Sequence, residues 1–436
     1  RFVERLRVAD SSIFPSITNG NLNSPTIWFL KKHQTMFLDV ECFHHLTLKS
    51  LFIPNGKIAR HKTLPNNTFN VIEPKTIYLE NHITYLFKSR IIMSTKEVFT
   101  NNATDLVIIG GGVNGCGIAR DAAGRGLSVI LVEMGDLGAA TSSASTKLFH
   151  GGLRYLEYFS FRLVKEALTE REVLLKSMPH ISWPMRFILP YDKFMRFNSF
   201  TPATKWINYI MPWSKSKRPF WLIKLGLYLY DSLGGRKILP PTKLLHFPNS
   251  KEGRPIKAKF KRGFEYSDCW VEDSRLVILN ARDAQDRGAT ILPRVKLIKA
   301  ERTKNYWILT FQDQKTNQEW QQKARYLINA AGPWVGSILE EKLGQIDMPS
   351  IRLVRGSHLV VKKQYDHEKA YFLQGRDGRI VFVIPYEQDF TLIGTTDVDH
   401  DSAQIKPVCT DEERDYLLEF VNLYFSKPVT KEDIVW

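Results

Sequence analysis

The stretch DLVIIGGGVNG, residues 105–115, joins a short apolar run to a glycine-rich turn. The apolar run predicts a buried parallel strand, and the glycines that follow it have the spacing GxGxxG. At this spacing Gly110 permits a tight turn, Gly112 lets the backbone approach a pyrophosphate, and Gly115 allows the next helix to pack on the strand. The first turn of that helix, which contains Asn114, has free N–H groups and a positive dipole end for the phosphates. The stretch therefore predicts a dinucleotide-binding site.

The residues after the turn complete a β-α-β unit. Residues 118–126 continue as a helix, residues 128–132 form a second apolar strand, and Glu133 ends it about twenty positions after the glycines. An acid at that point accepts hydrogen bonds from a ribose. The alternative is a purely structural turn with an ordinary glutamate at the strand end.

A hydroxyl cluster follows soon after the ribose acid and favours FAD over NAD. Thr141, Ser142, Ser143 and Ser145 lie in one run that ends at Lys147. Such a run can donate hydrogen bonds to a second phosphate along an extended cofactor. Taken alone, it would more often be a helix cap or a polar loop.

The composition excludes several classes of protein. The chain has 436 residues, of which 43% are hydrophobic, and this is enough for two or three domains. Its four cysteines have no CxxC spacing, so we expect neither a disulfide framework nor a metal site, and a cytoplasmic location fits. The formal charge of +16 is spread along the chain without a nucleic-acid motif, so no nucleic-acid partner is expected.

Longer motifs carry a specific resemblance. The run ATSSASTKLFHGGLRYLE at 140–157 is similar, nearly residue for residue, to the signature of the FAD-dependent, membrane-associated glycerol-3-phosphate dehydrogenases. Further matches are GFEYSDCW at 263–270, NAAGPW at 329–334, RGSH at 355–358 and IGTTD at 393–397. The resemblance runs from residue 104 to residue 436 and keeps the family's order.

The resemblance implies an α/β fold in which a Rossmann-like FAD-binding domain, of the glutathione-reductase and D-amino-acid-oxidase type, carries an antiparallel substrate domain. It also implies oxidation of sn-glycerol 3-phosphate to dihydroxyacetone phosphate, with the hydride passing to FAD and the electrons to a quinone. A planar guanidinium at Arg154, next to Tyr155, suits the phosphate. His358 and His150 are the candidates for the proton, and the sequence does not choose between them. Arg355 either adds positive potential or is solvent-exposed.

The expected site residues form two groups. The catalytic group is His358, His150, Arg154 and Tyr155. The cofactor-binding group is Gly110, Gly112, Asn114, Gly115, Glu133, Thr141, Ser142, Ser143, Ser145, Lys147, Leu148, His150, Gly152, Val295, Ala331 and Gly332.

The predicted organisation divides the chain into six parts. The chain begins with a remnant (1–38) and a non-native or unstructured linker (39–92). The first part of the FAD-binding domain (93–195) follows, and then a basic aromatic insertion (196–256). The second part of the FAD-binding domain (257–345) and an incomplete substrate domain (346–436) come last. The remnant, with LRVADSSIFP at 6–15 and GNLNSPT at 20–26, resembles the C-terminal end of the glucose-methanol-choline oxidoreductases, where Asn21 or Asn23 would match a catalytic Asn. We interpret residues 1–92 as the tail of a neighbouring gene joined to a start at Met93, against a genuine N-terminal extension.

Residues 205–221 interleave aromatic side chains with Lys and Arg, as in an interfacial anchor on an anionic leaflet. We expect peripheral attachment to the inner face of the cytoplasmic membrane, against a buried amphipathic helix with basic edges. The resemblance leaves a homodimer open.

Members of the family continue past the motif at 433–436 into further site residues, so the sequence predicts a fragment that binds FAD poorly and turns over little substrate. Two alternatives stay open: another FAD-dependent 2-hydroxy acid or amine oxidoreductase of the same fold, and a non-catalytic truncated or chimeric product.

Overall fold

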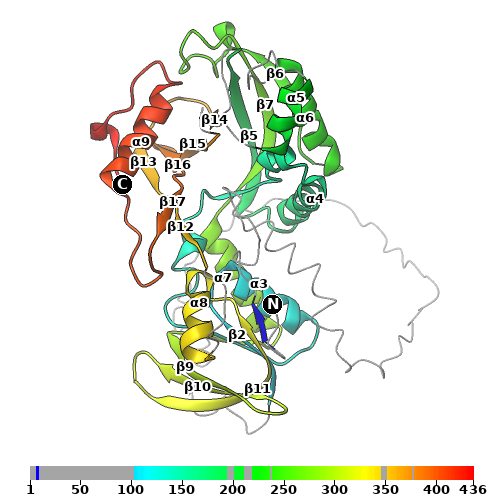
Figure 1. Ribbon diagram of the computed structural model, residues 1–436, viewed down its shortest axis with the longest axis vertical. Coiled ribbons are helices and arrows are strands. Elements are labelled where there is room, and N and C mark those ends of the chain that lie inside the picture. The colour runs from blue at the N-terminus through cyan, green and yellow to red at the C-terminus, as the bar shows by residue number, and fades with distance from the viewer. Residues whose placement is uncertain are drawn as a thin grey trace, which may run out of the picture. The chain divides into compact units, whose positions relative to one another are not determined.

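The computed structural model describes residues 6–8, 103–193, 201–210, 219–235, 238–344, 351–375 and 378–436 (Figure 1). The expectations for residues 1–5 and 9–102, including those for Asn21, Asn23 and Met93, lie outside these residues. The described strands form two large sheets and one small one. No helix within the described ranges is long and apolar enough to cross a bilayer.

The first sheet contains the predicted nucleotide-binding unit. Its strand order is β8-β3-β2-β11-β10-β9, and β1 also pairs with β11. The strands are β1 (Leu6–Val8), β2 (Thr104–Ile109), β3 (Val129–Glu133), β8 (Thr290–Pro293), β9 (Val295–Arg302), β10 (Trp307–Asp313) and β11 (Glu319–Asn329). β8, β3, β2 and β11 are mutually parallel, so their carboxyl ends meet at one edge. β1 runs parallel to Leu327–Asn329, beyond the part of β11 that pairs with β10.

Two helices pack against each other beside this sheet. α3 (Val113–Gly124) connects β2 to β3, and α7 (Asp273–Asp286) precedes β8. The carboxylate of Asp283, on α7, accepts from Arg120 on α3. The inner positions of α3 are small, with Ala119, Ala122 and Ala123 all buried, and small side chains let helices and strands approach closely. The predicted β-α-β unit is thus confirmed.

The second large sheet has the order β13-β16-β15-β14-β5-β7-β4, with β6 also paired to β7. Its strands are β4 (Leu148–Phe149), β5 (Ser182–Tyr191), β6 (Lys243–His246), β7 (Arg262–Val271), β13 (His358–Lys362), β14 (Ala370–Gln374), β15 (Ile380–Tyr386) and β16 (Phe390–Gly394). The small sheet pairs β12 (Leu353–Arg355) with β17 (Val398–His400).

Both faces of the second sheet are buried, because alternate residues of one strand enter different cores. In β14, Tyr371 and Leu373 pack in the core that includes α9 (Asp411–Asn422), whereas Phe372 packs in the core that includes α4 (Phe161–Ser177) and α6 (Phe220–Leu233). This alternation is the period of two expected of a strand. α5 (Pro202–Ile210) precedes α6.

Short helical segments complete the described chain: η3 (Thr141–Ser143), η4 (Leu153–Tyr158), η6 (Phe247–Asn249), η7 (Gly332–Trp334), α8 (Val335–Ser337), η8 (Ile338–Lys342) and η9 (Lys431–Asp433).

The fold class is the predicted one, but two of the expected domain limits cut across the second sheet. Residues 93–195 and 257–345 are the two expected parts of the FAD-binding domain, yet their strands β5 and β7 pair with each other over ten positions inside the second sheet. The expected limits differ from the observed sheets because the chain passes between the two sheets more often than the order of the sequence motifs indicates.

Candidate cofactor and substrate site

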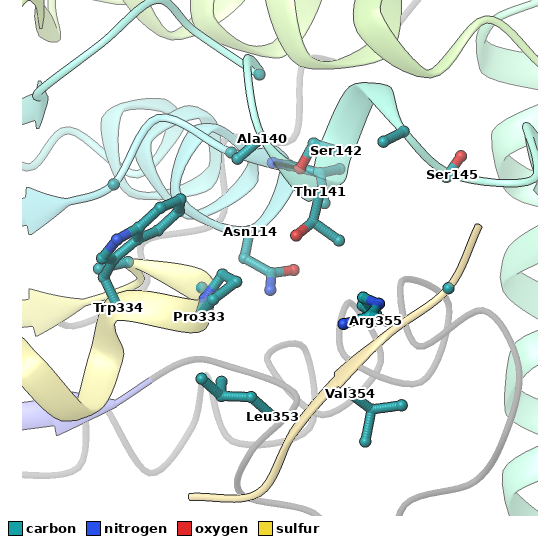
Figure 2. A pocket seen from close by; sticks show the side chains of 18 of the residues that line it. Asn114, Ala140, Thr141, Ser142, Ser145, Pro333, Trp334, Leu353, Val354 and Arg355 are labelled. Atoms are coloured by element: carbon teal, nitrogen blue, oxygen red, sulfur yellow. Dashed lines mark hydrogen bonds between the residues drawn. The ribbon is translucent and has the colours of Figure 1, made fainter. Parts of the chain in front are cut away.

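A cavity of about 760 Å³ lies where the carboxyl edge of the first sheet meets the second sheet. Figure 2 shows Asn114 and Thr141 on one side of it, while β12, with Leu353 and Arg355, crosses another side. Most of the expected site residues line this cavity: Gly110, Gly112, Asn114, Glu133, Thr141, Ser142, Ser145, Leu148, His150, Arg154, Tyr155, Val295, Ala331, Gly332 and His358.

The glycine turn has the backbone geometry that its spacing predicts. Gly110 has φ of +111°, and a Cβ atom there would lie 2.3 Å from the carbonyl oxygen of Ala330. A Cβ atom on Gly115 would lie 1.9 Å from the carbonyl oxygen of Gly110, so this glycine does not line the cavity but allows α3 to pack on the turn. The turn and the start of α3 therefore leave an open cradle of backbone.

Glu133 is held at the end of β3 by two backbone amides. Gly111 N–H donates to its Oε2 and Gly135 N–H to its Oε1, each at 2.7 Å. Each carboxylate oxygen has a second lone pair, so the side chain can still accept hydroxyl groups from a ligand in the cavity. This is the position and chemistry expected of a ribose acceptor.

Asn114 provides an independent test of whether a dinucleotide fits. Its Oδ1 atom is buried and has no hydrogen-bond partner among the described residues, although the side chain faces the cavity (Figure 2). Buried polar atoms are nearly always paired, so an unpaired one beside a helix N-terminus points to a missing ligand group. The residues present fit the adenine dinucleotide that the turn predicts.

The hydroxyl cluster divides into two parts. Thr141, Ser142 and Ser145 line the cavity, and the Ser142 hydroxyl also accepts Val113 N–H at 3.0 Å. Ser143 points elsewhere, because its hydroxyl donates to the carbonyl of Ala140.

Lys147, an expected cofactor-binding residue, has a protein partner in the structure. Its Nζ lies 2.7 Å from Asp273, its φ is +57°, and the residue is not part of the cavity wall. The ion pair joins the loop that contains Lys147 to the first residue of α7, so the positive charge of Lys147 neutralises the Asp273 carboxylate. Gly152 also lies off the wall, with φ of +70° and no room for a Cβ atom beside the Tyr155 ring.

His150 has a defined hydrogen-bond role. Gly152 N–H donates to its Nδ1 at 2.9 Å, so the neutral ring carries its proton on Nε2. Burial lowers the pKa of His150, the nearby Asp268 carboxylate opposes this shift, and Arg171 adds to it. At neutral pH the residue is therefore an uncharged donor at Nε2.

His358 faces the same cavity from the start of β13. Its Nε2 lies 3.0 Å from the hydroxyl of Thr146. Burial, together with the charge of Lys147, lowers the pKa of His358 to about 4, and Asp273 only partly opposes the shift. The ring is therefore neutral at pH 7, and one of its two nitrogens carries no proton.

Four arginines line the cavity, and they differ in their partners. Arg352 pairs with the carboxylate of Asp399. Arg355 is bound by the buried carboxylate of Glu413, at 3.1 Å from Nε and 3.0 Å from Nη2, so the solvent-exposed alternative is wrong. Arg379 stacks over the ring of Tyr416. Arg154 has no carboxylate partner within the described residues, so its charge is available to an anion.

Several wall residues were not predicted: Asp268, Trp334, Phe382, Arg379 and Asp397. Asp268 and Trp334 lie inside motifs that the resemblance covers, and a buried acid within an apolar strand was the one available signal for Asp268. Phe382 lies on β15 and Arg379 directly precedes that strand, and only the sheet pairing brings them to the site. The described residues contain no group of three metal-ligating side chains.

A Rossmann unit with an open glycine cradle, a strand-end acid and a second sheet over the cavity defines a two-domain dinucleotide-binding oxidoreductase. More specifically, the chain belongs to the family of FAD-dependent oxidoreductases, whose family model matches residues 105–436. FAD is therefore the cofactor of this site. The resemblance of residues 1–38 to a glucose-methanol-choline oxidoreductase is not borne out.

Three relatives are similar over most of the described chain. D-erythritol 1-phosphate dehydrogenase of Brucella abortus is 47% identical over 331 residues, which is 76% of this chain and 62% of the relative. The aerobic glycerol-3-phosphate dehydrogenase of Escherichia coli is 46% identical over 332 residues, 76% of this chain and 61% of the relative. The structure of glycerol-3-phosphate dehydrogenase from Bacillus halodurans with FAD has a TM-score of 0.55 and 28% identity, covering 77% of this chain and 56% of that one. The chain thus spans about three fifths of the length of these proteins.

Proposed function

We propose that this protein oxidises the secondary alcohol of a small polyol phosphate, sn-glycerol 3-phosphate, to dihydroxyacetone phosphate. The observation that carries the proposal is the guanidinium of Arg154, which has no carboxylate partner in the part of the chain that the structure describes, in a cavity that also contains the FAD cradle and two neutral histidines. The names of the relatives support a polyol phosphate as the substrate class.

In this proposal Arg154 binds the phosphate, and the buried ring of Tyr155 supports the turn on which Arg154 lies. FAD, when bound, accepts the hydride from the carbinol carbon. His358 takes the hydroxyl proton, because its ring is neutral and its basic nitrogen is unprotonated at pH 7. His150, whose Nδ1 is already occupied, donates from Nε2 to the oxygen of the reacting carbon.

The test is anaerobic bleaching of the flavin in the isolated protein. Glycerol 3-phosphate is expected to bleach the flavin absorbance, whereas glycerol, 2-hydroxy acids and amines are not. Replacing Arg154 with Met removes a charge-assisted contact of about 2–3 kcal/mol, so the substrate concentration for half-maximal bleaching should rise roughly 100-fold.

Arg162→Met is the matched control, because this exposed arginine pairs with Glu166 away from the cavity. Bleaching by a 2-hydroxy acid or an amine, but not by glycerol 3-phosphate, would contradict our proposal. The protein would then be another FAD-dependent 2-hydroxy acid or amine oxidoreductase of the same fold. A protein that folds but retains no flavin would favour the non-catalytic reading. D-erythritol 1-phosphate in the same assay distinguishes a four-carbon from a three-carbon substrate.

We further propose that α5 and α6 form a docking face for an anionic membrane surface, where a quinone accepts the electrons. Four aromatic side chains project from these two helices: Trp206 is 58% exposed, Tyr209 86%, Trp221 56% and Tyr228 66%. Exposed Lys205 and Lys224 accompany them. Such a mixture suits the boundary between headgroups and acyl chains. The rest of the predicted segment, residues 211–218, lies outside the described part.

Flotation with lipid vesicles tests this docking face. The protein should float with vesicles that contain phosphatidylglycerol, and less with neutral vesicles. Trp206→Ser combined with Trp221→Ser should weaken flotation by at least tenfold, because each buried aromatic contributes about 1.5–3 kcal/mol. Substitution of the exposed Leu244, on β6, is the control. Equal flotation of all forms would contradict the docking face.

A further inference from the structure

A chain of hydrogen bonds fixes the backbone of the loop that carries His150 and Arg154. Gly151 N–H donates to the Tyr230 hydroxyl at 2.7 Å. That hydroxyl lies 2.8 and 3.0 Å from the two carboxylate oxygens of Asp268. Since an amide can only donate and a carboxylate can only accept, the hydroxyl must accept from Gly151 and donate to Asp268. The direction of every bond in the chain is therefore fixed.

The chain of bonds ends on a buried cation. Arg171 Nη1 donates to Asp268 Oδ1 at 2.6 Å and to the carbonyl of Ser267 at 2.9 Å. Tyr230, Asp268 and Arg171 are 1%, 3% and 5% exposed. Hydrogen bonds in such a dry environment are stronger than at a surface, and an unpaired member is correspondingly unfavourable.

Packing adds to the hydrogen bond at Gly151. A Cβ atom on this residue would lie 2.2 Å from the Leu168 side chain and 2.9 Å from the Tyr230 ring, so the backbone rests directly on both. The next amide, Gly152 N–H, is the one that donates to His150 Nδ1. A displacement of Gly151 would therefore move the donor that sets the His150 tautomer, and the turn η4 that carries Arg154.

We propose that Tyr230 is a positioning residue for the site, although it lies 79 positions from Gly151 along the chain. Its hydroxyl, oriented by Asp268 and Arg171, fixes the Gly151 amide and so the direction in which His150 and Arg154 face the cavity. The identity of the ligand rests on the proposed function, but the positioning of the loop does not.

Tyr230→Phe tests the proposal with little change of shape. In hydrogen exchange measured by mass spectrometry, peptides that contain residues 148–156 should exchange about tenfold faster at the protected amide, while other peptides keep their rates. Tyr365→Phe is the matched control, since Tyr365 is also buried and its hydroxyl donates to the carbonyl of Val383 at 2.9 Å, in a different core. Unchanged exchange in 148–156, or a uniform increase over the whole chain, would overturn the proposal.

Two further measurements test the positioning role of Tyr230: the exchange rate of the Gly151 amide in the unmodified protein and the KM of the variants. In the unmodified protein, residue-level exchange should show a protected Gly151 amide, and exchange at the rate of an open loop overturns the proposal even if the variant fails to fold. In substrate assays Tyr230→Phe should raise the KM for glycerol 3-phosphate about tenfold, with a smaller effect in Tyr365→Phe. If the unmodified protein does not oxidise the phosphate, the proposed function fails while the exchange experiment still decides on Tyr230.

Discussion

Replacement of His358 with Gln should remove an acid-sensitive contribution to the stability of the fold. The imidazole is held against Thr146 and is exposed to the charge of Lys147. Burial and this charge lower the pKa of His358 from 6.5 to about 4, so the folded chain resists protonation at a pH where the unfolded chain does not.

The size of the effect follows from the two pKa values. As the pH falls below 6.5 the unfolded chain takes up a proton that the folded chain binds only near pH 4, so stability is lost within this window. At about 1.4 kcal/mol per pH unit, the complete loss is about 3 kcal/mol, and roughly 2 kcal/mol of it falls between pH 7 and pH 5. Above pH 7 the contribution of His358 no longer changes.

The assay is urea unfolding at pH 7 and at pH 5, followed by tryptophan fluorescence. The free energy of unfolding of the unmodified protein should fall by about 2 kcal/mol more than that of His358→Gln over this interval. His246→Gln, at an exposed histidine of β6, should keep the full dependence of the unmodified protein. Equal losses in the unmodified protein and in His358→Gln would refute the burial of a neutral imidazole at this position.

Three further predictions concern the cofactor cradle and α9. Gly115→Ala should abolish FAD retention and lower the free energy of unfolding by several kcal/mol, because its Cβ atom would lie 1.9 Å from the carbonyl oxygen of Gly110; the flavin absorbance and urea unfolding measure this. Glu133→Gln should weaken FAD binding about tenfold in a fluorescence titration, since one of its two amide contacts would face an NH₂ group. Thr410→Ala should lower the free energy of unfolding by about 1 kcal/mol, because it removes half of the capping box with Glu413, and an unchanged urea midpoint would contradict this.

The features that local sequence determines were predicted correctly. The turn at 110–115 and the strand-end Glu133 depend on residues within one β-α-β unit, and they occur as expected. The hairpin of β10 and β11 is also a local structure, and its turn contains Asn317 at φ of +57°. Its left-handed conformation suits an asparagine.

The features that depend on distant pairing were not predicted. The position of Lys147 at the end of a hydroxyl-rich run favours contact with the cofactor. Its partner, Asp273, is brought to it only by the packing of α7 beside that run. The hydrogen-bond partners of Asp268 could not be predicted from its own segment, because Arg171 and Tyr230 lie on two different helices, α4 and α6, that precede it in the sequence. Periodicity is a property of one segment of sequence, whereas this hydrogen-bond network joins side chains from three segments.

The chain crosses between the two large sheets three times: between β3 and β4, between β7 and β8, and between β11 and β13 by way of β12 in the small sheet. The first crossing, at 134–147, and the described residues of the third, at 330–344 and 351–352, form much of the cavity wall. Neither sheet could therefore be excised as a contiguous fragment, and folding requires many contacts between distant residues, which makes it slow. A ligand in the cavity binds both crossings at once, so it should raise the melting temperature of the two sheets together, as a single transition.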